Sequence, residues 1–273
     1  KQTAQLAVVS AGSTRVIASG GIDISVGSVL GLCSMVAAYL CVRAGWPLPA
    51  ACAGAIVCGG LCGLINGALI SRLRLAPIIV TLAMFAAARA AAELLNAGNS
   101  ISGIPASLTE NLAGSDLLGI PVLFWIGLAT LVAAGVLLKT TALGRSLLAI
   151  GGNRTAAQLS GVPVESVEML VYTLNGALAG LAGVINVAQA ATGAPTAGLY
   201  MELQAITAVV LGGSDITGGR ATMAGAGLGV LTINVLISGG RLLGHEDQAA
   251  RFLVGAALLA AVEAQNWRRR KSG

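Results

Sequence analysis

Residues 48–70 read LPAACAGAIVCGGLCGLINGALI, an apolar run without a single Asp, Glu, Lys or Arg. A helix needs about 20 predominantly apolar residues to cross the hydrocarbon core of a bilayer, which is about 30 Å thick. The run has that length, and a helix satisfies its own backbone hydrogen bonds in lipid. We therefore expect this stretch to form a transmembrane helix.

Comparable runs recur along the rest of the chain. Clear candidates for spanning helices are residues 26–42, 48–70, 76–95, 119–138, 168–190, 222–238 and 249–265. Two candidates are weaker: 5–19 is interrupted by Arg15, and 203–213 is short enough to be a broken helix buried in protein. The sequence thus predicts an all-α, polytopic transmembrane helical bundle with about nine spans or partial spans.

The composition supports the same class. Hydrophobic residues make up 56% of the 273 residues, charged residues make up 10%, and the mean hydropathy is +0.85. Soluble proteins carry roughly 25% charged residues, so the composition argues against a soluble enzyme. The five cysteines are odd in number and show no metal-ligand arrangement, so we interpret them as small buried apolar residues. No cofactor is expected.

The net charge of +5 indicates membrane topology rather than nucleic-acid binding. If 203–213 crosses, most basic residues fall on one side: Arg72, Arg74, Lys139, Arg145, Arg154, Arg220 and the cluster 268–271. Lys and Arg concentrate in cytoplasmic loops, so residues 71–75, 139–167 and the C-terminus are expected in the cytoplasm. The predicted organisation is one membrane domain, 1–267, followed by a basic cytoplasmic tail, 268–273.

Glycine spacing predicts how the helices pack. Gly59, Gly63 and Gly67 are spaced four apart, as are the pairs Gly176/Gly180 and Gly225/Gly229. This spacing places them on one helix face, where the missing side chains let a neighbouring helix approach closely. Close helix packing is the favoured interpretation, and a pore lining is the alternative.

One short motif occurs twice. Gly20-Gly21-Ile22-Asp23-Ile24-Ser25-Val26-Gly27 is echoed by Gly212-Gly213-Ser214-Asp215-Ile216-Thr217-Gly218-Gly219. Each copy follows a short or interrupted apolar segment and precedes a spanning helix, which suggests parallel repeats. Asp with Ser or Thr between glycines suits a helix N-cap, and direct substrate contact is the alternative.

The loop 139–167 is unusually long for a connection between spans. Residues 154–161 predict about two turns of helix, ended by Gly161 and by Pro163 beyond it. Such a helix is too short to be stable alone and needs a docking surface. Leu147, Leu148 and Leu159 are expected to be exposed there, which indicates a protein partner rather than lipid headgroups.

Thr155-Ala156-Ala157-x-x-x-Gly161 resembles the Glu-Ala-Ala-x-x-x-Gly helix by which bacterial ABC importer permeases contact their ATPase, with Thr155 in place of the usual Glu. More specifically, Gly21-Ile-Asp-Ile-Ser-Val-Gly-Ser28 is similar to a signature of ribose-type monosaccharide permeases. Gly144-Arg145 with Ala149-Ile-Gly-Gly-Asn153, and Glu202-Leu203 with the stretch 205–213, resemble two further motifs of that family.

The resemblance implies the membrane subunit of an ATP-driven importer that carries a monosaccharide or similar sugar across the bacterial inner membrane. It implies these partners: a second, identical or different, permease chain, cytoplasmic ABC ATPase subunits and a periplasmic sugar-binding protein. The implied ATPase-coupling residues are Gly151, Gly152, Asn153, Arg154, Thr155, Ala156, Ala157, Leu159 and Gly161. The residues of the repeated motif are Gly20, Gly21, Asp23, Ser25, Gly27, Gly212, Gly213, Asp215, Thr217 and Gly219. The family has about ten spans, so we expect a chain short of its first.

Other functions remain open from the residues alone. Branched-chain amino-acid permeases have similar cytoplasmic loops, and an ion-driven carrier would use intramembrane acids, of which Glu93 and Glu263 lie near span ends. We expect Arg89 and Glu93 to form a structural ion pair. His245 is expected in a solvated loop. The sequence has no Gly-x-x-x-x-Gly-Lys loop, so we do not expect this subunit to hydrolyse ATP by that route, and the resemblance implies a separate ATPase subunit. Polar residues that could face a path include Asn66, Thr81, Asn175, Asn186, Gln189 and Thr207.

Overall fold

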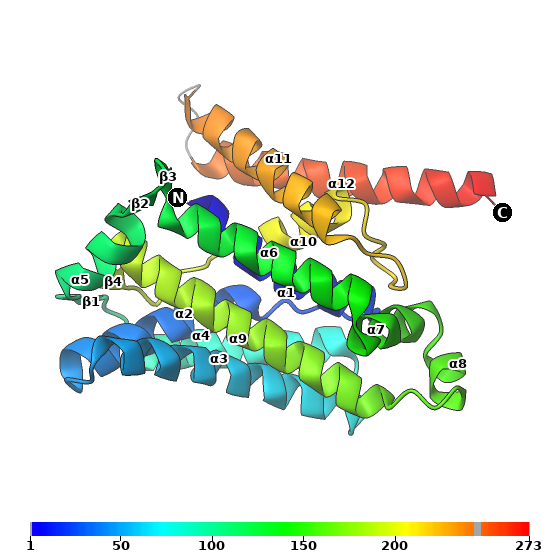
Figure 1. Cartoon of the computed structure of the whole chain (residues 1–273), viewed down its shortest axis with the longest axis horizontal. Helices are drawn as coiled ribbons and strands as arrows, with labels where there is room; N and C mark the ends of the chain where they lie inside the picture. The colour runs from blue at the N-terminus through cyan, green and yellow to red at the C-terminus, as the bar shows by residue number, and fades with distance from the viewer. Residues whose placement is uncertain (1, 243–246, 273) are drawn as a thin grey trace.

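The computed structural model describes residues 2–242 and 247–272, which form an elongated helical bundle (Figure 1). The α-helices are α1 (Gln2–Ala18), α2 (Val26–Ala38), α3 (Leu48–Ser71), α4 (Pro77–Leu94), α5 (Ala106–Leu108), α6 (Val122–Thr140), α7 (Ala142–Gly152), α8 (Arg154–Leu159), α9 (Val164–Ala190), α10 (Met201–Leu211), α11 (Met223–Leu242) and α12 (Asp247–Ser272). Two π-helical turns are η1 (Tyr39–Arg43) and η2 (Thr109–Gly114).

Strands are confined to two short antiparallel pairs within the described ranges. β1 (Ile101–Ser102) pairs with β4 (Thr192–Gly193), and β2 (Asp116–Leu117) pairs with β3 (Ile120–Pro121). Each strand is two residues long, so these pairs only fasten loops. The predicted all-α class is confirmed.

Six helical segments are long and apolar enough to cross a membrane, which confirms a polytopic membrane protein. They are Val26–Arg43, Leu48–Ser71, Pro77–Leu94, Val122–Thr140, Val164–Ala190 and Met223–Gly240. The remaining clear candidate, 249–265, lies in α12, where the described apolar stretch is only Phe252–Glu263. The two weaker candidates form α1 and the shorter α10.

Proline marks where the long helices begin. Pro77 is the first residue of α4, and Pro49 lies in the first turn of α3. Pro121 and Pro163 directly precede α6 and α9. Proline has no N–H and a fixed φ, so it fits a helix start but not a helix interior. This explains why α9 begins at Val164 rather than at residue 168.

Glycine lets two pairs of helices approach closely. A Cβ atom on Gly176 of α9 would collide with the carbonyl oxygen of Gly59 on α3, and one on Gly63 would collide with the α9 backbone. Gly225 of α11 faces Gly212 at the end of α10 in the same way. Close helix packing is therefore confirmed at these positions, and the pore-lining alternative is wrong for them.

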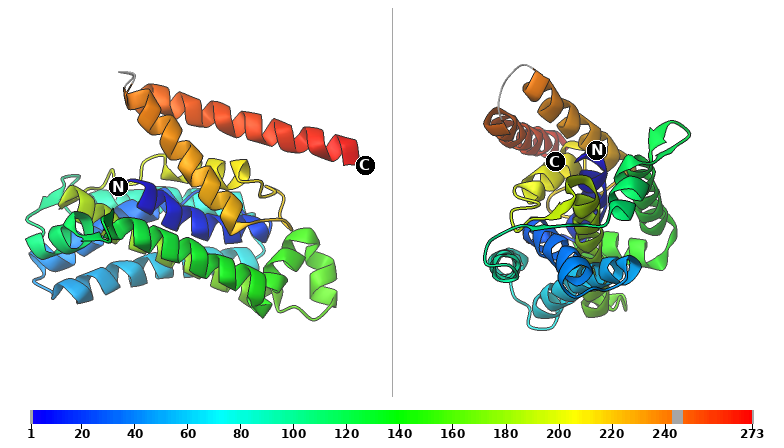
Figure 2. Two further views of the ribbon diagram at one scale, coloured as in Figure 1. Left: turned by 45° about the horizontal axis from the view of Figure 1, so that its top comes forward. Right: turned by 90° about the vertical axis from the view of Figure 1, so that its left-hand side faces the viewer.

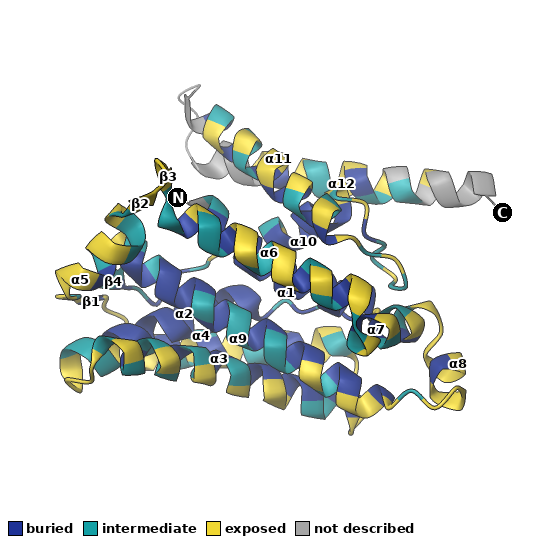
Figure 3. Ribbon diagram, in the orientation of Figure 1, coloured by how far each residue is buried: buried dark blue, intermediate teal, exposed yellow. Residues whose placement is uncertain are grey.

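Helix α1 is the buried centre of the bundle. Residues 4–19 are all buried, and α1 packs against α6, α9, α10 and α11. Figure 3 shows that α2 is also buried along most of its length, whereas α6 carries many exposed residues. Arg15 is only 5% exposed, and its Nε donates to the Ala11 carbonyl at 3.2 Å. Arg15 thus faces the interior of the bundle, not lipid.

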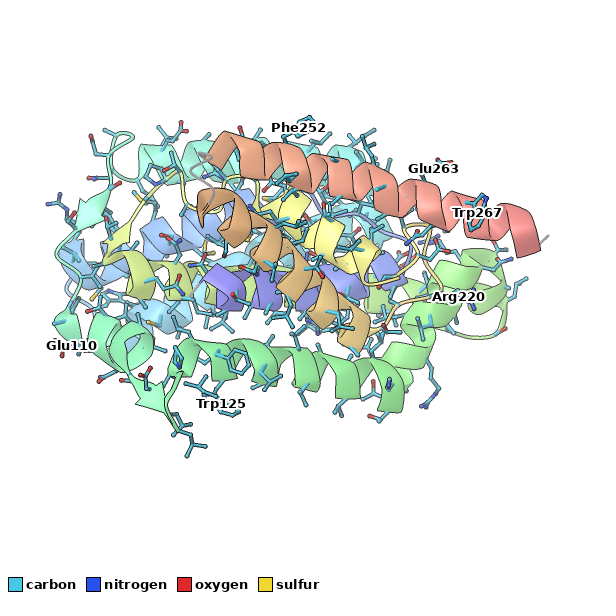
Figure 4. The ribbon with its side chains drawn as sticks, turned by 90° about the horizontal axis from the view of Figure 1, so that it is seen from above. Glu110, Trp125, Arg220, Phe252, Glu263 and Trp267 are labelled. Atoms are coloured by element: carbon cyan, nitrogen blue, oxygen red, sulfur yellow. The ribbon has the colours of Figure 1, made fainter. Side chains whose placement is uncertain are left out.

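Connections gather at the two ends of the bundle. At one end lie α5 and the strand pairs, and at the other α7 and α8 project beyond α6 and α9 (Figures 1 and 2). Figure 4 shows Glu110 at the first end and Arg220 at the second. Helix α12 continues to Ser272 through most of the predicted tail, 268–273. His245 lies outside the described residues.

Candidate functional site

The loop 139–167 forms two helices held by side-chain caps. The Thr141 hydroxyl accepts the Gly144 N–H at 3.2 Å at the start of α7, and the Asn153 side chain accepts the Ala156 N–H at 3.0 Å at the start of α8. Gly161 then takes a left-handed φ of 83°, which a residue with a side chain adopts only under strain. The predicted short helix, ended by Gly161, is confirmed as α8.

A bidentate salt bridge connects α8 to α9. The Nε and Nη2 atoms of Arg154 each donate to a carboxylate oxygen of Glu168, both at 2.9 Å. Parallel bonds of this kind fix orientation as well as distance. The Glu168 carboxylate raises the pKa of Arg154 above its ordinary value, so the guanidinium stays charged. Although Thr155 replaces the family's glutamate, α8 still has an ionic anchor.

One side of α8 is buried and the other is open. Ala157 is 5% exposed and docks the helix, while Thr155 and Ala156 are exposed and Leu159 is 85% exposed. The expected exposure of Leu147 is wrong: it is fully buried, because α7 turns this residue into an apolar cluster with residues of α9. Leu159 is therefore the large apolar side chain that this segment presents outward.

Asp23 of the first motif copy organises a buried polar cluster. Its Oδ1 accepts hydrogen bonds from the Ser25 N–H (2.9 Å) and hydroxyl (2.6 Å), and its Oδ2 accepts from the Asn175 amide at 2.8 Å. The Asn66 amide donates to the Ser25 hydroxyl at 3.1 Å. All four residues are at most 4% exposed. The cluster therefore joins the start of α2 to α3 and α9 in the protein interior.

The second copy repeats the turn but not the burial. The Asp215 Oδ1 accepts the Thr217 N–H at 2.9 Å and hydroxyl at 2.8 Å. The residue that caps α11 is Thr222, whose hydroxyl accepts the Gly225 N–H at 3.1 Å. In the first copy, Asp23 binds Ser25, which precedes α2. The prediction that these aspartates cap the following helices is therefore wrong, because both instead close a turn ahead of the helix.

The structural correspondence between the two motif copies is offset by one residue from their correspondence in sequence. Gly20 ends α1 with a φ of 82°, and the residue that ends α10 in the same conformation is Gly213, with a φ of 88°. The sequence pairs Gly20 with Gly212 instead, but Gly212 packs against α11. Gly21 faces the Tyr172 hydroxyl, and Gly27 faces the carboxylate of Glu202, which belongs to another resembling motif. The motif glycines thus have separate packing roles.

Three motifs distant in sequence meet at one point, which we call the glycine junction (Gly20, Gly151, Gly218 and Gly219). The Gly219 N–H donates to the Ala18 carbonyl at 3.0 Å. A Cβ atom on Gly218 would lie 2.7 Å from the Gly20 Cα, and one on Gly151 would collide with the Ala18 carbonyl. The end of α7 is therefore packed directly against both motif copies.

The expected path residues fall into separate groups. Asn66 and Asn175 belong to the Asp23 cluster, and the Thr81 hydroxyl donates within its own helix, to Pro77, at 2.9 Å. Gln189 accepts a hydrogen bond from the Gln5 amide at 2.8 Å. Asn186 and Thr207 line a cavity that also contains Gln5. The structure therefore brings only part of this set to a common space.

The expected ion pair between Arg89 and Glu93 is wrong. The Arg89 guanidinium donates instead to the carbonyls of Pro195 and Ala197, the latter at 3.1 Å. The structure has one salt bridge among its described residues, between Arg154 and Glu168. Arg89 thereby holds the loop before α10, and the Glu202 carboxylate also attracts it.

Comparison with known families decides the class of the protein. A family model described as "Branched-chain amino acid transport system / permease component" matches residues 2–262. The chain belongs to this permease family. No solved structure matches it.

Its relatives include sugar import permeases. The permease is 36% identical over 275 residues to the ribose import permease protein RbsC of Escherichia coli K12, covering 97% of this chain and 84% of the relative. It is 34% identical over 278 residues to the fructose import permease protein FrcC of Rhizobium meliloti, covering 99% and 77%. It is 36% identical over 254 residues to the L-arabinose ABC transporter permease protein AraH of Azospirillum brasilense, covering 93% and 74%.

Several residues of this permease site escape prediction from sequence. Glu168 is the first residue of the predicted span 168–190 and lies one turn inside α9, and its pairing with Arg154 depends on how α8 folds back. Tyr172 and Glu202 are buried against motif glycines. The available signal was a polar side chain within an apolar run or at its edge. That signal marks burial, but it does not identify the partner.

Proposed function

We propose that this chain is the membrane-spanning subunit of an ATP-driven importer for a monosaccharide or similar sugar in the bacterial inner membrane. Family membership and the sugar-import relatives support the class and the substrate. A second permease chain would complete the pathway, a periplasmic sugar-binding protein would deliver the substrate, and cytoplasmic ABC ATPases would supply energy. Catalysis of ATP hydrolysis belongs to those ATPases.

The proposed topology has nine crossings or partial crossings. To the six long apolar helices it adds α1, α10 and α12. The loops that carry Arg72, Arg74 and Arg220 then lie at the α8 end, together with Lys139 in the last turn of α6, and we assign this end to the cytoplasm. Residues 1–267 form one permease domain, and the basic residues 268–271 lie on the cytoplasmic side.

The observation that carries the coupling mechanism is the glycine junction. Residues 139–167 form the proposed ATPase-docking surface, with Leu159 as its apolar contact. A movement of α7 cannot be absorbed by intervening side chains, because Gly151 lies directly on the backbone of residues 18 and 219. Displacement of α7 and α8 by the ATPases therefore shifts both motif turns, and with them the starts of α2 and α11.

Leu159→Asp tests the docking surface. We expect loss of ATPase copurification and at least a tenfold fall in sugar uptake, because a charge replaces the apolar contact at a buried interface. The matched control is Leu118→Asp, since Leu118 is equally exposed at 85% but lies in the β2–β3 hairpin at the opposite end. The measurements are ATPase copurification in detergent and uptake of labelled D-ribose, D-fructose and L-arabinose.

Gly161→Leu supplies a second test of the same surface. The left-handed φ of 83° disfavours any side chain there, although no described atom lies within 4 Å of the position a Cβ would take. We expect reduced coupling from a displaced α8 rather than from a steric clash. Unchanged uptake and unchanged copurification in both variants would refute the docking assignment.

A further inference from the structure

A cavity that is partly open to the surface lies apart from the glycine junction. It has a volume of about 360 Å³ and is bounded by α1, α9, α10, α11 and α12. In Figure 4, α11 and α12 lie in front of α10, part of which is visible between them. The loop that leads into α10 also borders the cavity, at the end of the bundle opposite α8 (Figure 1). Its size falls within the range of about 300–1,000 Å³ found for ligand pockets.

Uncharged polar side chains from four helices converge on this cavity. They are Gln5 of α1, Asn186 of α9, Gln204 and Thr207 of α10, and Asn234 of α11. Among the described residues that line it, none is an acid or a base. The rest of the lining is largely apolar, as in sites where a few polar groups orient a ligand.

Internal hydrogen bonds hold several of these side chains in place. The Gln5 amide donates to Gln189 at 2.8 Å, and the Asn234 amide donates to the Val230 carbonyl at 2.9 Å. The Thr207 hydroxyl donates to the Leu203 carbonyl at 2.7 Å. Side chains fixed in this way lose little conformational entropy when a ligand binds. The lining is therefore preorganised.

This chemistry selects among solutes. Amide and hydroxyl groups both donate and accept, as do the hydroxyls of a sugar. A zwitterionic amino acid would bring an ammonium and a carboxylate into a space whose described lining has no opposite charge, and burying unpaired charge is strongly unfavourable. A metal ion or proton without a paired charge would be unfavourable in this space for the same reason.

We propose that this cavity is a binding chamber for a neutral, polyhydroxylated solute during transport, with Gln5, Gln204, Thr207 and Asn234 as its contacts. This proposal rests on the proposed sugar-import function, and it adds where in the chain the sugar binds during transport. Solute enters past the loop before α10, from the side opposite the docking surface.

Gly255 of α12 offers a way to fill the chamber. It lines the cavity, and no described atom lies within 4 Å of the position that a Cβ would take. A side chain there starts in open space, so we expect a phenylalanine to occupy part of the cavity without pushing the helices apart. Gly239 of α11 is a matched control, because no described atom lies within 4 Å of its Cβ position either and it is not among the described residues that line the cavity.

The test compares Gly255→Phe, Gly239→Phe and Asn234→Leu in the complete importer. Uptake of D-ribose, D-fructose, L-arabinose and L-leucine is measured, together with ATPase copurification and thermal stability of the purified complex. We expect Gly255→Phe to lower the maximal uptake of the transported sugar at least tenfold, and Asn234→Leu to lower it about fivefold. Assembly and stability remain unchanged, and Gly239→Phe behaves as wild type.

The outcomes separate the two proposals. If wild-type protein imports a sugar and both chamber variants import it equally well, the chamber is refuted and the proposed function stands. Import of L-leucine without any sugar would refute both. If either phenylalanine variant fails to assemble, Asn234→Leu decides between the outcomes. This variant removes only the side-chain hydrogen bond to the Val230 carbonyl, which lies within helix α11, so we expect it to fold.

Discussion

At the scale of single residues, Asp23 and Asp215 show how surroundings set the importance of a motif. Both aspartates accept the same pair of bonds from a Ser or Thr two residues later. Asp23 is 4% exposed and also binds Asn175, whereas Asp215 is half-buried. The two aspartates therefore form the same local turn, but we expect Asp23 to contribute more to the stability of the protein.

Asp23→Ala and Asp215→Ala form a matched pair that tests this difference. Asp23→Ala leaves the Ser25 N–H and the Asn175 amide buried without their acceptor, so we expect a loss of about 1–3 kcal/mol in stability. Asp215→Ala removes the same local bonds nearer to solvent and is expected to lose less than about 1 kcal/mol. Thermal unfolding in one detergent measures both. Equal losses would contradict the assigned role of burial.

At the scale of helices, the contact of α3 with α9 has the least tolerance for added volume. The two backbones touch through Gly59 and Gly176, so no side chain separates them. Small residues make such approaches possible in membranes, where packing rather than water drives association. Helix α2 lies against both helices of this pair, and α1 lies against α9.

Gly176→Ala measures that tolerance. The new methyl group would overlap the Gly59 carbonyl, so the helices must separate, at a cost of about 1–3 kcal/mol or more. Gly60→Ala is the control on the neighbouring face of α3, since its Cβ would lie 3.8 Å from the Ala177 Cβ, an ordinary contact. The yield of monodisperse protein and its unfolding temperature report the difference. A stable Gly176→Ala protein would argue against backbone contact.

At the scale of the whole molecule, the arrangement has two chemically different ends. Helices α7 and α8 form one end, and the strand pairs and η2 form the other (Figure 1). The proposed docking surface and the proposed chamber lie towards opposite ends. The coupling that we propose between them would run along α1, which contributes Gln5 to the chamber and whose last residue, Ala18, lies at the glycine junction.

Cysteine accessibility tests the proposed orientation. In a background without the five native cysteines, Leu159→Cys should react with a membrane-impermeant maleimide only in inside-out vesicles. Asn99→Cys, in the exposed turn after α4, should react only in right-side-out vesicles. The physical basis is the concentration of Lys and Arg in cytoplasmic loops. The reverse labelling pattern would invert the topology, and with it the assignment of the docking surface.

Much of the fold could be predicted from local features of the sequence. Apolar runs gave the positions of the long helices, because span length and apolarity are properties of contiguous residues. Gly161 and Pro163 marked the end of α8, since backbone constraints act on single residues. The start of α9 was missed because the polar first turn of that helix lies outside its apolar run.

The sequence by itself determined a polytopic helical membrane protein, the glycine faces of α3 and α9, and a short helix between two long ones. Only the tertiary structure decided that Leu147 is buried, that Arg89 binds backbone carbonyls rather than Glu93, and that Gly20, Gly151 and Gly218 meet. The reason is physical: helix formation depends on neighbours along the chain, whereas these contacts join residues brought together by the packing of distant helices.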